Sequence, residues 1–207
     1  MNIDILRLCL VTDRVLSRGR PLVDVVAAAV QGGVTMVQLR EKSATTREFL
    51  DEARALKAFL KPRGIPLIIN DRVDIALAVE ADGVHVGQKD MPVDIVRSMI
   101  GPGKIIGLSI TNHAQLARPD SALPDYLGMG PLYAQTTKAD ASTPLGVEGF
   151  RALRAETGKP VIAIGGLNTG NSGPVLAAGA NGLAVVSAIV SADDPRAAAQ
   201  AFTDLNR

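Results

Sequence analysis

Eight short runs of hydrophobic residues are spread along the chain, and each run ends abruptly in polar or glycine residues. The longer stretches between them carry apolar residues at the three- and four-residue spacing of an amphipathic helix, as in 22–30 and 49–60. The pattern therefore predicts eight strands that alternate with helices. We expect the strands at Leu6–Thr12, Met36–Leu39, Leu67–Ile69, Gly83–Val86, Ile105–Leu108, Tyr126–Met129, Val161–Ile164 and Leu183–Val186.

Local signals mark where the expected helices begin and end. Pro21 stands at the start of the first helix, where a missing N–H is harmless, and Gly32 and Gly33 end that helix. Thr45 and Glu48 form the capping-box pattern at the start of the second helix. The alternation of strand and helix predicts a parallel sheet with right-handed crossovers.

The number of strand–helix units decides between two architectures. Eight units predict an α/β fold, a closed (β/α)₈ TIM barrel that occupies residues 1–207 as a single domain. The alternative, an open doubly wound sheet, fits less well because no Gly-x-Gly-x-x-Gly follows the first strand. Only 3% of residues are aromatic while 47% are hydrophobic, so aliphatic side chains must fill a sheet buried on both faces.

Charge and cysteine content exclude several classes of function. The formal net charge of +1 gives no support for nucleic-acid or acidic-membrane binding. Cys9 is the only cysteine, so no disulfide can form within the chain, and we expect a buried thiol. No run approaches the roughly 18 apolar residues of a membrane span, and the first residues lack a signal-peptide core. We expect a cytoplasmic protein that acts on small molecules, and the sequence leaves a homo-oligomer open.

Two carboxylates follow neighbouring strands at the end of the barrel where such folds place their chemistry. Asn70 and Asp71 follow the third expected strand, and Asp90 follows the fourth. The two aspartates can hold Mg²⁺, which typically takes one or two protein carboxylates together with phosphate oxygens. The alternative is that each aspartate caps the helix that follows it.

Cations and glycines follow the other strands. Arg40 and Lys42 follow the second strand and Lys138 lies in the loop after the sixth, where they could neutralise a pyrophosphate. Gly165-Gly166 and Val186-Ser187 follow the last two strands, at the usual phosphate site of this architecture. Backbone N–H groups at such loops can approach an oxyanion closely. The alternative is that the glycine pair forms only a tight turn.

No general base stands out in the sequence. His85 lies inside the fourth strand, where we expect a packed, hydrogen-bonded side chain, and His113 lies at a helix start. Lys104 and Lys159 begin strands and therefore belong to the opposite end of the barrel. A pyrophosphate clamp and a second phosphate pocket without a nucleophile fit a substitution at carbon in which pyrophosphate leaves. In such a reaction the protein positions the reactants and stabilises charge.

Several motifs together resemble the thiamine-phosphate synthase family and cover nearly the whole chain in order. The longest is NDRVDIALAVEADGVHVGQKD at residues 70–90. The others are LVTD (10–13), QLREK (38–42), GLS (107–109), DYLGMGPLY (125–133), TK (137–138), AIGGL (163–167) and AVVSAI (184–189).

The resemblance implies a TIM barrel that joins 4-amino-2-methyl-5-hydroxymethylpyrimidine diphosphate to 4-methyl-5-(2-phosphoethyl)thiazole, giving thiamine phosphate and pyrophosphate with Mg²⁺ as cofactor. The implied mechanism is dissociative, so pyrophosphate leaves before the thiazole nitrogen attacks. Asp71 and Asp90 would hold Mg²⁺. The implied catalytic residues are Arg40, Lys42, Ser109 and Lys138, and the implied substrate-binding residues are Gln38, Leu39, Arg40, Glu41, Lys42, Asn70, Ser109, Gln135, Thr136, Thr137, Lys138, Gly166, Val186 and Ser187.

One residue departs from the family pattern, and two other functions remain as alternatives. Gln135 stands where the family usually has the first Thr of Pro-Thr-x-Thr-Lys, at a contact to the thiazole phosphate. A thiazole tautomerase-like enzyme would share the barrel and phosphate pocket but lack the diphosphate and metal set. A non-catalytic phosphate-ligand-binding barrel is the other alternative. Clustered charges favour the synthase, because so many unpaired charges would be costly without a ligand.

Overall fold

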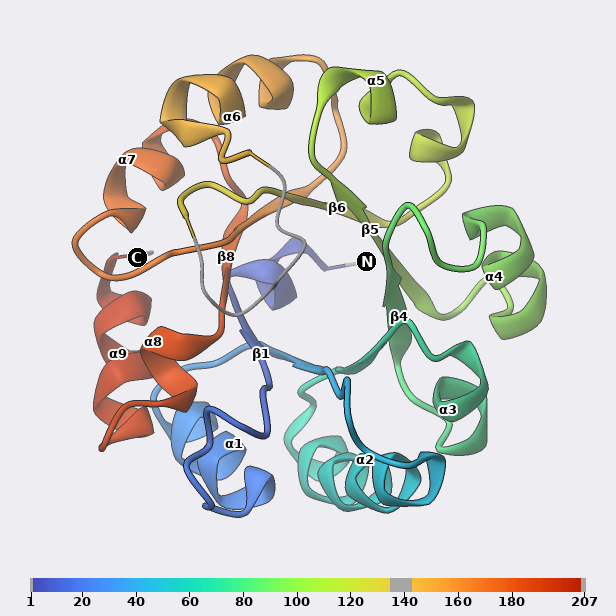
Figure 1. The fold of residues 1–207 in the computed structure, drawn as a ribbon, viewed down its shortest axis with the longest axis vertical. Helices are drawn as coiled ribbons and strands as arrows, with labels where there is room; N and C mark the ends of the chain where they lie inside the picture. The colour runs from blue at the N-terminus through green and yellow to red at the C-terminus, as the bar shows by residue number, and fades with distance from the viewer. Residues whose placement is uncertain (1, 135–142, 206–207) are drawn as a thin grey trace.

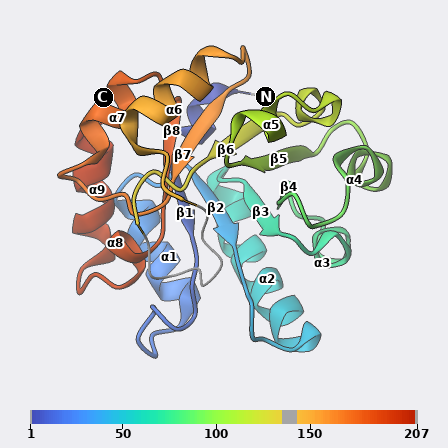
Figure 2. The same ribbon diagram turned by 45° about the horizontal axis from the view of Figure 1, so that its top comes forward.

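The chain folds into a closed parallel barrel, with β1 pairing to β8 to complete the ring. The computed structural model describes residues 2–134 and 143–205. Helices surround the strands on the outside (Figures 1 and 2). This confirms the (β/α)₈ barrel and excludes the open doubly wound sheet. The strands are β1 (Leu8–Val11), β2 (Met36–Leu39), β3 (Leu67–Asn70), β4 (Gly83–Val86), β5 (Ile105–Ile110), β6 (Tyr126–Met129), β7 (Val161–Ile164) and β8 (Gly182–Val185).

The helices confirm the predicted alternation, with additions at both ends of the chain. The capping box of Thr45 and Glu48 is present. The first strand begins later than predicted, because a 3₁₀ turn, η1 (Ile3–Leu6), occupies the start of that apolar run, and a short helix follows β8 directly. The helices are α1 (Leu22–Gln31), α2 (Thr46–Leu60), α3 (Val73–Ala78), α4 (Val93–Ile100), α5 (His113–Leu116), α6 (Gly146–Ala155), α7 (Ser172–Ala177), α8 (Ser187–Val190) and α9 (Pro195–Leu205), with 3₁₀ turns η2 (Lys61–Arg63) and η3 (Pro119–Ala122).

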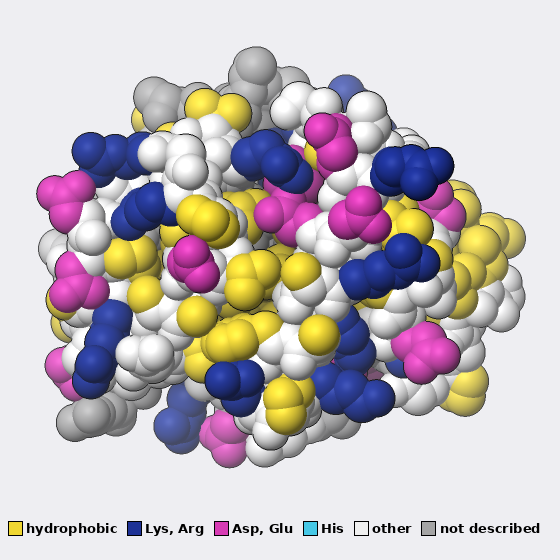
Figure 3. Space-filling model, turned by 90° about the horizontal axis from the view of Figure 1, so that it is seen from below, with side chains coloured by type: hydrophobic (Ala, Val, Ile, Leu, Met, Phe, Trp, Pro, Cys, Tyr) yellow, Lys and Arg dark blue, Asp and Glu magenta, His cyan; other side chains and the backbone are white. Residues whose placement is uncertain are grey.

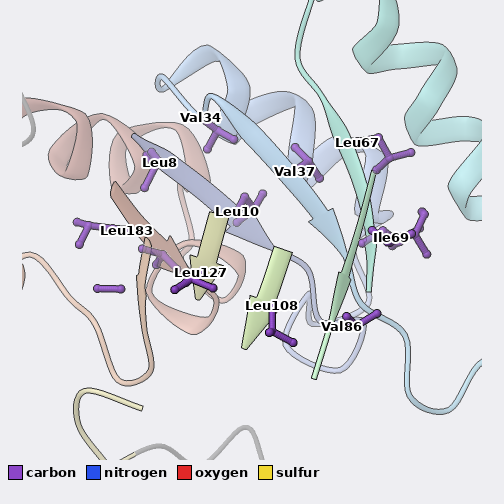
Figure 4. Packing of buried hydrophobic residues seen from close by; sticks show 14 of the residues in the cluster. Leu8, Leu10, Val34, Val37, Leu67, Ile69, Val86, Leu108, Leu127 and Leu183 are labelled. Carbon is purple, nitrogen blue, oxygen red and sulfur yellow. The ribbon is translucent and has the colours of Figure 1, made fainter. Parts of the chain in front are cut away.

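Alternating side chains along each strand fill two separate hydrophobic layers. Those that point outward, such as Leu10, Ile69 and Leu108, pack between the strands and the helices (Figure 4). Those that point inward form a smaller cluster in the barrel, which includes Cys9 and Tyr126. The buried thiol is confirmed, and burial raises the pKa of Cys9 to about 12, so the side chain is an uncharged packing group.

Four polar side chains lie around the amino-terminal end of the barrel. Each belongs to the residue just before an even-numbered strand and accepts a hydrogen bond from a backbone N–H near the start of the preceding strand. The backbone N–H of the same residue donates back to the carbonyl of that partner. We call these four residues the basal ring. Its members and their donors are Thr35 with Leu8 (2.9 Å), Asp82 with Leu67 (2.8 Å), Asp125 with Ile106 (2.8 Å) and Asn181 with Val161 (2.8 Å).

Lysine side chains at the basal end also serve the fold. Lys104 Nζ donates to the Ala81 carbonyl at 2.7 Å, and Lys159 Nζ donates to the Pro124 carbonyl at 2.6 Å. Both lysines therefore lie at the structural end, as predicted, and are engaged with backbone. The opposite, carboxyl ends of the strands are left for the chemistry.

The surface carries charges of both signs. On the face formed by α1 and α2, Lys and Arg side chains are interspersed with Asp and Glu, and hydrophobic side chains gather between the two helices (Figure 3). Among the residues that the structure describes, no helix is long and apolar enough to cross a membrane.

Candidate active site

Two amides meet at the carboxyl ends of β2 and β3. Gln38 Nε2 donates to Asn70 Oδ1 at 2.7 Å. Gln38 is 3% exposed and Asn70 is half-buried, so the pair lines the inner wall of the barrel near its mouth. The structure therefore brings together two of the predicted substrate-binding residues, and their mutual bond holds the orientation of both side chains.

The two predicted metal ligands lie close to one another. Asp71 has a left-handed backbone (φ 63°), which is uncommon for a residue other than glycine, and its N–H donates to the His85 carbonyl at 2.9 Å. Burial raises the pKa of Asp90, and the neighbouring Asp71 carboxylate raises it further, against a lowering by the Gly87 N–H. The site thus brings two like charges together, and a bound cation would relieve their repulsion.

Helix capping does not explain these carboxylates. The residues at the N-cap positions of α3 and α4 are Arg72 and Pro92, and neither helix receives a side-chain cap. Asp90 Oδ2 instead accepts a hydrogen bond from the Gly87 N–H at 2.7 Å, inside the loop that follows β4. The capping alternative is therefore wrong for both aspartates.

The predicted cations after β2 lie beside the carboxylates. Lys42 Nζ is 2.6 Å from Asp71 Oδ2. Arg40 is mostly buried, with Nη1 3.7 Å from Asp13 Oδ2, and its N–H donates to Thr12 Oγ1 at 3.0 Å. Thr12 is fully buried and was not predicted to have a role, although it ends a predicted strand. Its hydroxyl fixes the backbone that carries Arg40.

The other side chains of segment 38–42 turn away from the barrel mouth. Leu39 is fully buried in the layer between strands and helices. The Glu41 side chain is 2% exposed and its Oε2 is 3.2 Å from Arg14 Nε, while Arg14 Nη2 is 2.5 Å from Glu52 Oε2. Leu39 and Glu41 can therefore meet a ligand in the barrel mouth only through their backbone. Arg14 and Glu52, which anchor this loop from outside, were not predicted from the sequence.

Ser109 belongs to a hydrogen-bonded group inside the barrel. Its Oγ is 2.9 Å from His85 Nε2, and His85 Nδ1 is 2.9 Å from the Tyr126 hydroxyl. Gln88 Nε2 donates to the Ser109 carbonyl at 2.8 Å. The prediction that His85 is a packed, hydrogen-bonded barrel residue is confirmed. Tyr126 was not predicted to have a role, because the sequence places it only at the start of a strand.

The loops after β7 and β8 lie side by side, because those strands are neighbours. Gly165 and Gly166 both have positive φ, at 104° and 66°. A Cβ on Gly166 would lie 2.8 Å from Tyr133 Cβ, so this position has no room for a larger residue. Val186 precedes α8, and Ser187 is its first residue. The two loops therefore present glycine backbone and a helix start next to each other.

Some predicted residues lie outside the described part of the chain. Gln135, Thr136, Thr137 and Lys138 fall in the segment 135–142. Within residues 2–134 and 143–205, no cluster of three or more His, Cys, Asp or Glu side chains is placed to hold a metal. A metal held by the described residues would therefore depend on the pair formed by Asp71 and Asp90.

A family model and two curated relatives identify the same family for this chain. A family model described as thiamine monophosphate synthase matches residues 8–189. The thiamine-phosphate synthase of Albidiferax ferrireducens is 54% identical to this chain over 199 residues, which cover 96% of this chain and 91% of that protein. The thiamine-phosphate synthase of Chloroflexus aurantiacus is 52% identical over 194 residues, which cover 94% of this chain and 89% of that protein.

A solved structure agrees with these sequence matches. Thiamine phosphate pyrophosphorylase from Pyrococcus furiosus superposes on this chain with a TM-score of 0.89 at 36% sequence identity. The superposition covers 99% of this chain and 96% of that chain. The similarity therefore extends over the whole barrel.

Proposed function

The chain belongs to the thiamine monophosphate synthase family of enzymes, and from this we propose that it joins 4-amino-2-methyl-5-hydroxymethylpyrimidine diphosphate to 4-methyl-5-(2-phosphoethyl)thiazole. The products are thiamine phosphate and pyrophosphate. The observation that carries the proposal is the group formed by Lys42, Asp71 and Asp90 at neighbouring strand ends. A cation beside a pair of carboxylates suits a diphosphate that binds together with a divalent metal ion.

Mg²⁺ fits the residues that are present. Asp71 and Asp90 cap no helix, and they lie close enough to repel each other. Their oxygens are the hard ligands that Mg²⁺ prefers, and one or two carboxylates suffice when phosphate oxygens complete the coordination. We assign these two residues as the ones that would hold the ion. Bound there, it would supply positive charge against the diphosphate oxygens.

The proposed reaction exchanges one bond at carbon for another. The C–O bond between the pyrimidine methylene and the diphosphate breaks, and its electron pair leaves with pyrophosphate. The thiazole nitrogen then gives its lone pair to the methylene carbon and forms the new C–N bond. Neither step removes a proton, so the site needs no general base, and the protein acts by positioning and by charge stabilisation.

The side chains around the mouth supply that stabilisation. Arg40 and Lys42 would bind the diphosphate, and their attraction grows as negative charge develops on the leaving group. Asp13 and Thr12 hold Arg40 in place before the substrate binds. Ser109 would add a hydroxyl contact to the same group.

The pyrimidine and the thiazole phosphate are assigned to separate parts of the mouth. Gln38 and Asn70, which orient each other, would bind the pyrimidine diphosphate on the β2–β3 side. Gly166, Val186 and Ser187 would bind the thiazole phosphate on the β7–β8 side, where the positive φ angles of Gly165 and Gly166 can turn backbone N–H groups toward an anion. The two substrates would then meet over the centre of the barrel.

The test combines both substrates with purified protein, with MgCl₂ or with EDTA. Thiamine phosphate is measured by chromatography and pyrophosphate by a coupled assay. We expect equal amounts of the two products with MgCl₂ and none with EDTA. The absence of thiamine phosphate with MgCl₂ would refute the proposed reaction, and equal rates in EDTA would refute the metal requirement.

A further inference from the structure

A line of three polar side chains runs from the barrel interior to its mouth. Tyr126 is 0% exposed and His85 is 6% exposed, whereas Ser109 is half-buried at the carboxyl end of β5. His85 Nδ1 lies 2.9 Å from the Tyr126 hydroxyl, and His85 Nε2 lies 2.9 Å from Ser109 Oγ. The imidazole therefore bridges a deeply buried hydroxyl and one that faces the substrate side.

Two glycines make the space that the imidazole occupies. A Cβ at Gly107 would lie 2.4 Å from His85 Nδ1 and 2.5 Å from the Tyr126 hydroxyl oxygen, and a Cβ at Gly128 would lie 2.9 Å from His85 Cε1. Both glycines sit within strands. These positions need glycine because of its small size, since neither glycine lies in a turn. The imidazole ring of His85 is therefore held in one position.

The direction of the two hydrogen bonds follows from the burial of Tyr126. Its hydroxyl must donate, because a buried O–H without an acceptor is costly, and within the described residues His85 Nδ1 is the acceptor found for it. Burial also raises the pKa of Tyr126 well above its usual value, so the proton stays on the phenol. Nδ1 is therefore unprotonated, and the imidazole carries its proton on Nε2.

The Nε2–H then donates to Ser109 Oγ and occupies an acceptor position on that oxygen. The hydroxyl proton of Ser109 then donates to a different acceptor, on the open side of the residue. In the opposite arrangement Ser109 would donate to Nε2, and the Tyr126 proton would be buried without an acceptor. The geometry favours the first arrangement.

We propose that Tyr126 and His85 are positioning residues that hold Ser109 as a hydrogen-bond donor to the diphosphate. The inference deepens the proposed function and rests on it, because it assigns a direction to the Ser109 contact. A donor aimed at the leaving group binds more strongly as negative charge develops there, so its loss lowers kcat more than it raises KM.

The first test is a direct measurement of the His85 tautomer. The chain contains two histidines, and His113→Gln removes the other one, whose exposed side chain pairs with Glu156. Long-range ¹⁵N–¹H correlation spectra of the free His113→Gln protein at pH 7.5 should show an Nε2–H imidazole. An Nδ1–H imidazole or an imidazolium would overturn the proposal, whatever the outcome of any activity assay.

The second test is a double-mutant cycle with Tyr126→Phe and Ser109→Ala. Ser109→Ala should lower kcat by about 100-fold and Tyr126→Phe by about 10-fold, with smaller changes in KM. Because Tyr126 acts through Ser109, Tyr126→Phe should change kcat less than about twofold in the Ser109→Ala background. A 10-fold loss in both backgrounds, or no loss in either, would overturn the positioning role.

Failure of the proposed function can be distinguished from failure of this inference alone. If the proposed function is wrong, the unsubstituted protein makes no thiamine phosphate. If only this inference is wrong, the unsubstituted protein is active, but the tautomer or the cycle gives the opposite result. Thermal melts of each variant establish that it is folded, and the tautomer alone decides the matter if Tyr126→Phe does not fold.

Discussion

Replacing Asp125 by alanine removes one member of the basal ring. Asp125 Oδ2 accepts hydrogen bonds from the Ile106 N–H at 2.8 Å and from Arg97 Nη2 at 2.7 Å. Ile106 is fully buried at the start of β5. The substitution therefore leaves a buried backbone donor without its acceptor and an arginine without its ion-pair partner.

The expected cost follows from these two losses. A buried donor left unsatisfied costs about 1–3 kcal/mol, and a partly exposed ion pair adds up to about 1 kcal/mol. We expect a loss of about 3 kcal/mol in the free energy of unfolding. For a chain of this size each kcal/mol lowers Tm by roughly 2–4 °C, so the melting temperature should fall by about 6–12 °C.

Urea unfolding and thermal melts, both followed by circular dichroism, measure this effect against two controls. Asp125→Asn keeps a neutral acceptor for Ile106 and should lose only about 1 kcal/mol. Asp193→Ala removes a carboxylate that is 94% exposed in its pair with Arg18 and should cost less than about 0.5 kcal/mol.

The basal ring lies at the end of the barrel opposite the proposed active site, so Asp125→Ala should retain its kcat at temperatures where it is folded. A stability equal to that of Asp193→Ala would refute the reasoning, and so would a loss of activity without a loss of stability.

Three other predictions concern the site and its surroundings. Gly166→Ala places a methyl group on a left-handed backbone, 2.8 Å from Tyr133 Cβ. It should raise the KM for the thiazole phosphate about 10-fold or more. The KM for the pyrimidine diphosphate should stay within about twofold. Lys42→Met should show the reverse pattern in steady-state kinetics, because it removes a cation that we propose binds the diphosphate. Burial raises the pKa of Glu52 to about 7 from its ordinary value of 4.5, and the Glu41 carboxylate adds to this rise against a lowering by Arg14. The folded protein then holds a proton that the unfolded chain releases, so stability falls as pH rises between these values, and Glu52→Gln should flatten that fall in urea unfolding at pH 5 and pH 8.

The sequence predicted the barrel and the grouping of Lys42, Asp71 and Asp90 because both depend on local patterns. Strands of this fold are continuous apolar runs that stop at polar residues, and the chemistry follows the stops. Asp71, Asp90 and Lys42 could be placed near each other by that rule alone. The start of β1 was wrong because Leu6 is as apolar as a strand residue, although it is buried beneath the barrel in a 3₁₀ turn.

Contacts between distant positions could not be predicted in this way. Tyr126 and His85 are separated by 41 positions, and each member of the basal ring is a single polar residue whose partner lies 15 to 27 positions away. The direction of the Glu41 side chain depends on the path of the chain after β2, and Arg14 and Glu52 set that path. Such pairings follow from the closed ring and leave no periodic signal in the sequence.

The proposed role of the carboxylate pair is tested most directly by Asp71→Asn. This variant keeps the size of the side chain and removes one charge of the pair. Asp74→Asn is a matched control in the first turn of α3, where the Asp74 carboxylate pairs with Arg72. The rate of thiamine phosphate formation is measured over a MgCl₂ titration, with thermal melts to confirm folding. We predict that Asp71→Asn lowers kcat on the order of 100-fold and requires more MgCl₂, while Asp74→Asn stays within about twofold of the unsubstituted enzyme. Normal turnover of Asp71→Asn at the same MgCl₂ concentration would contradict the assignment.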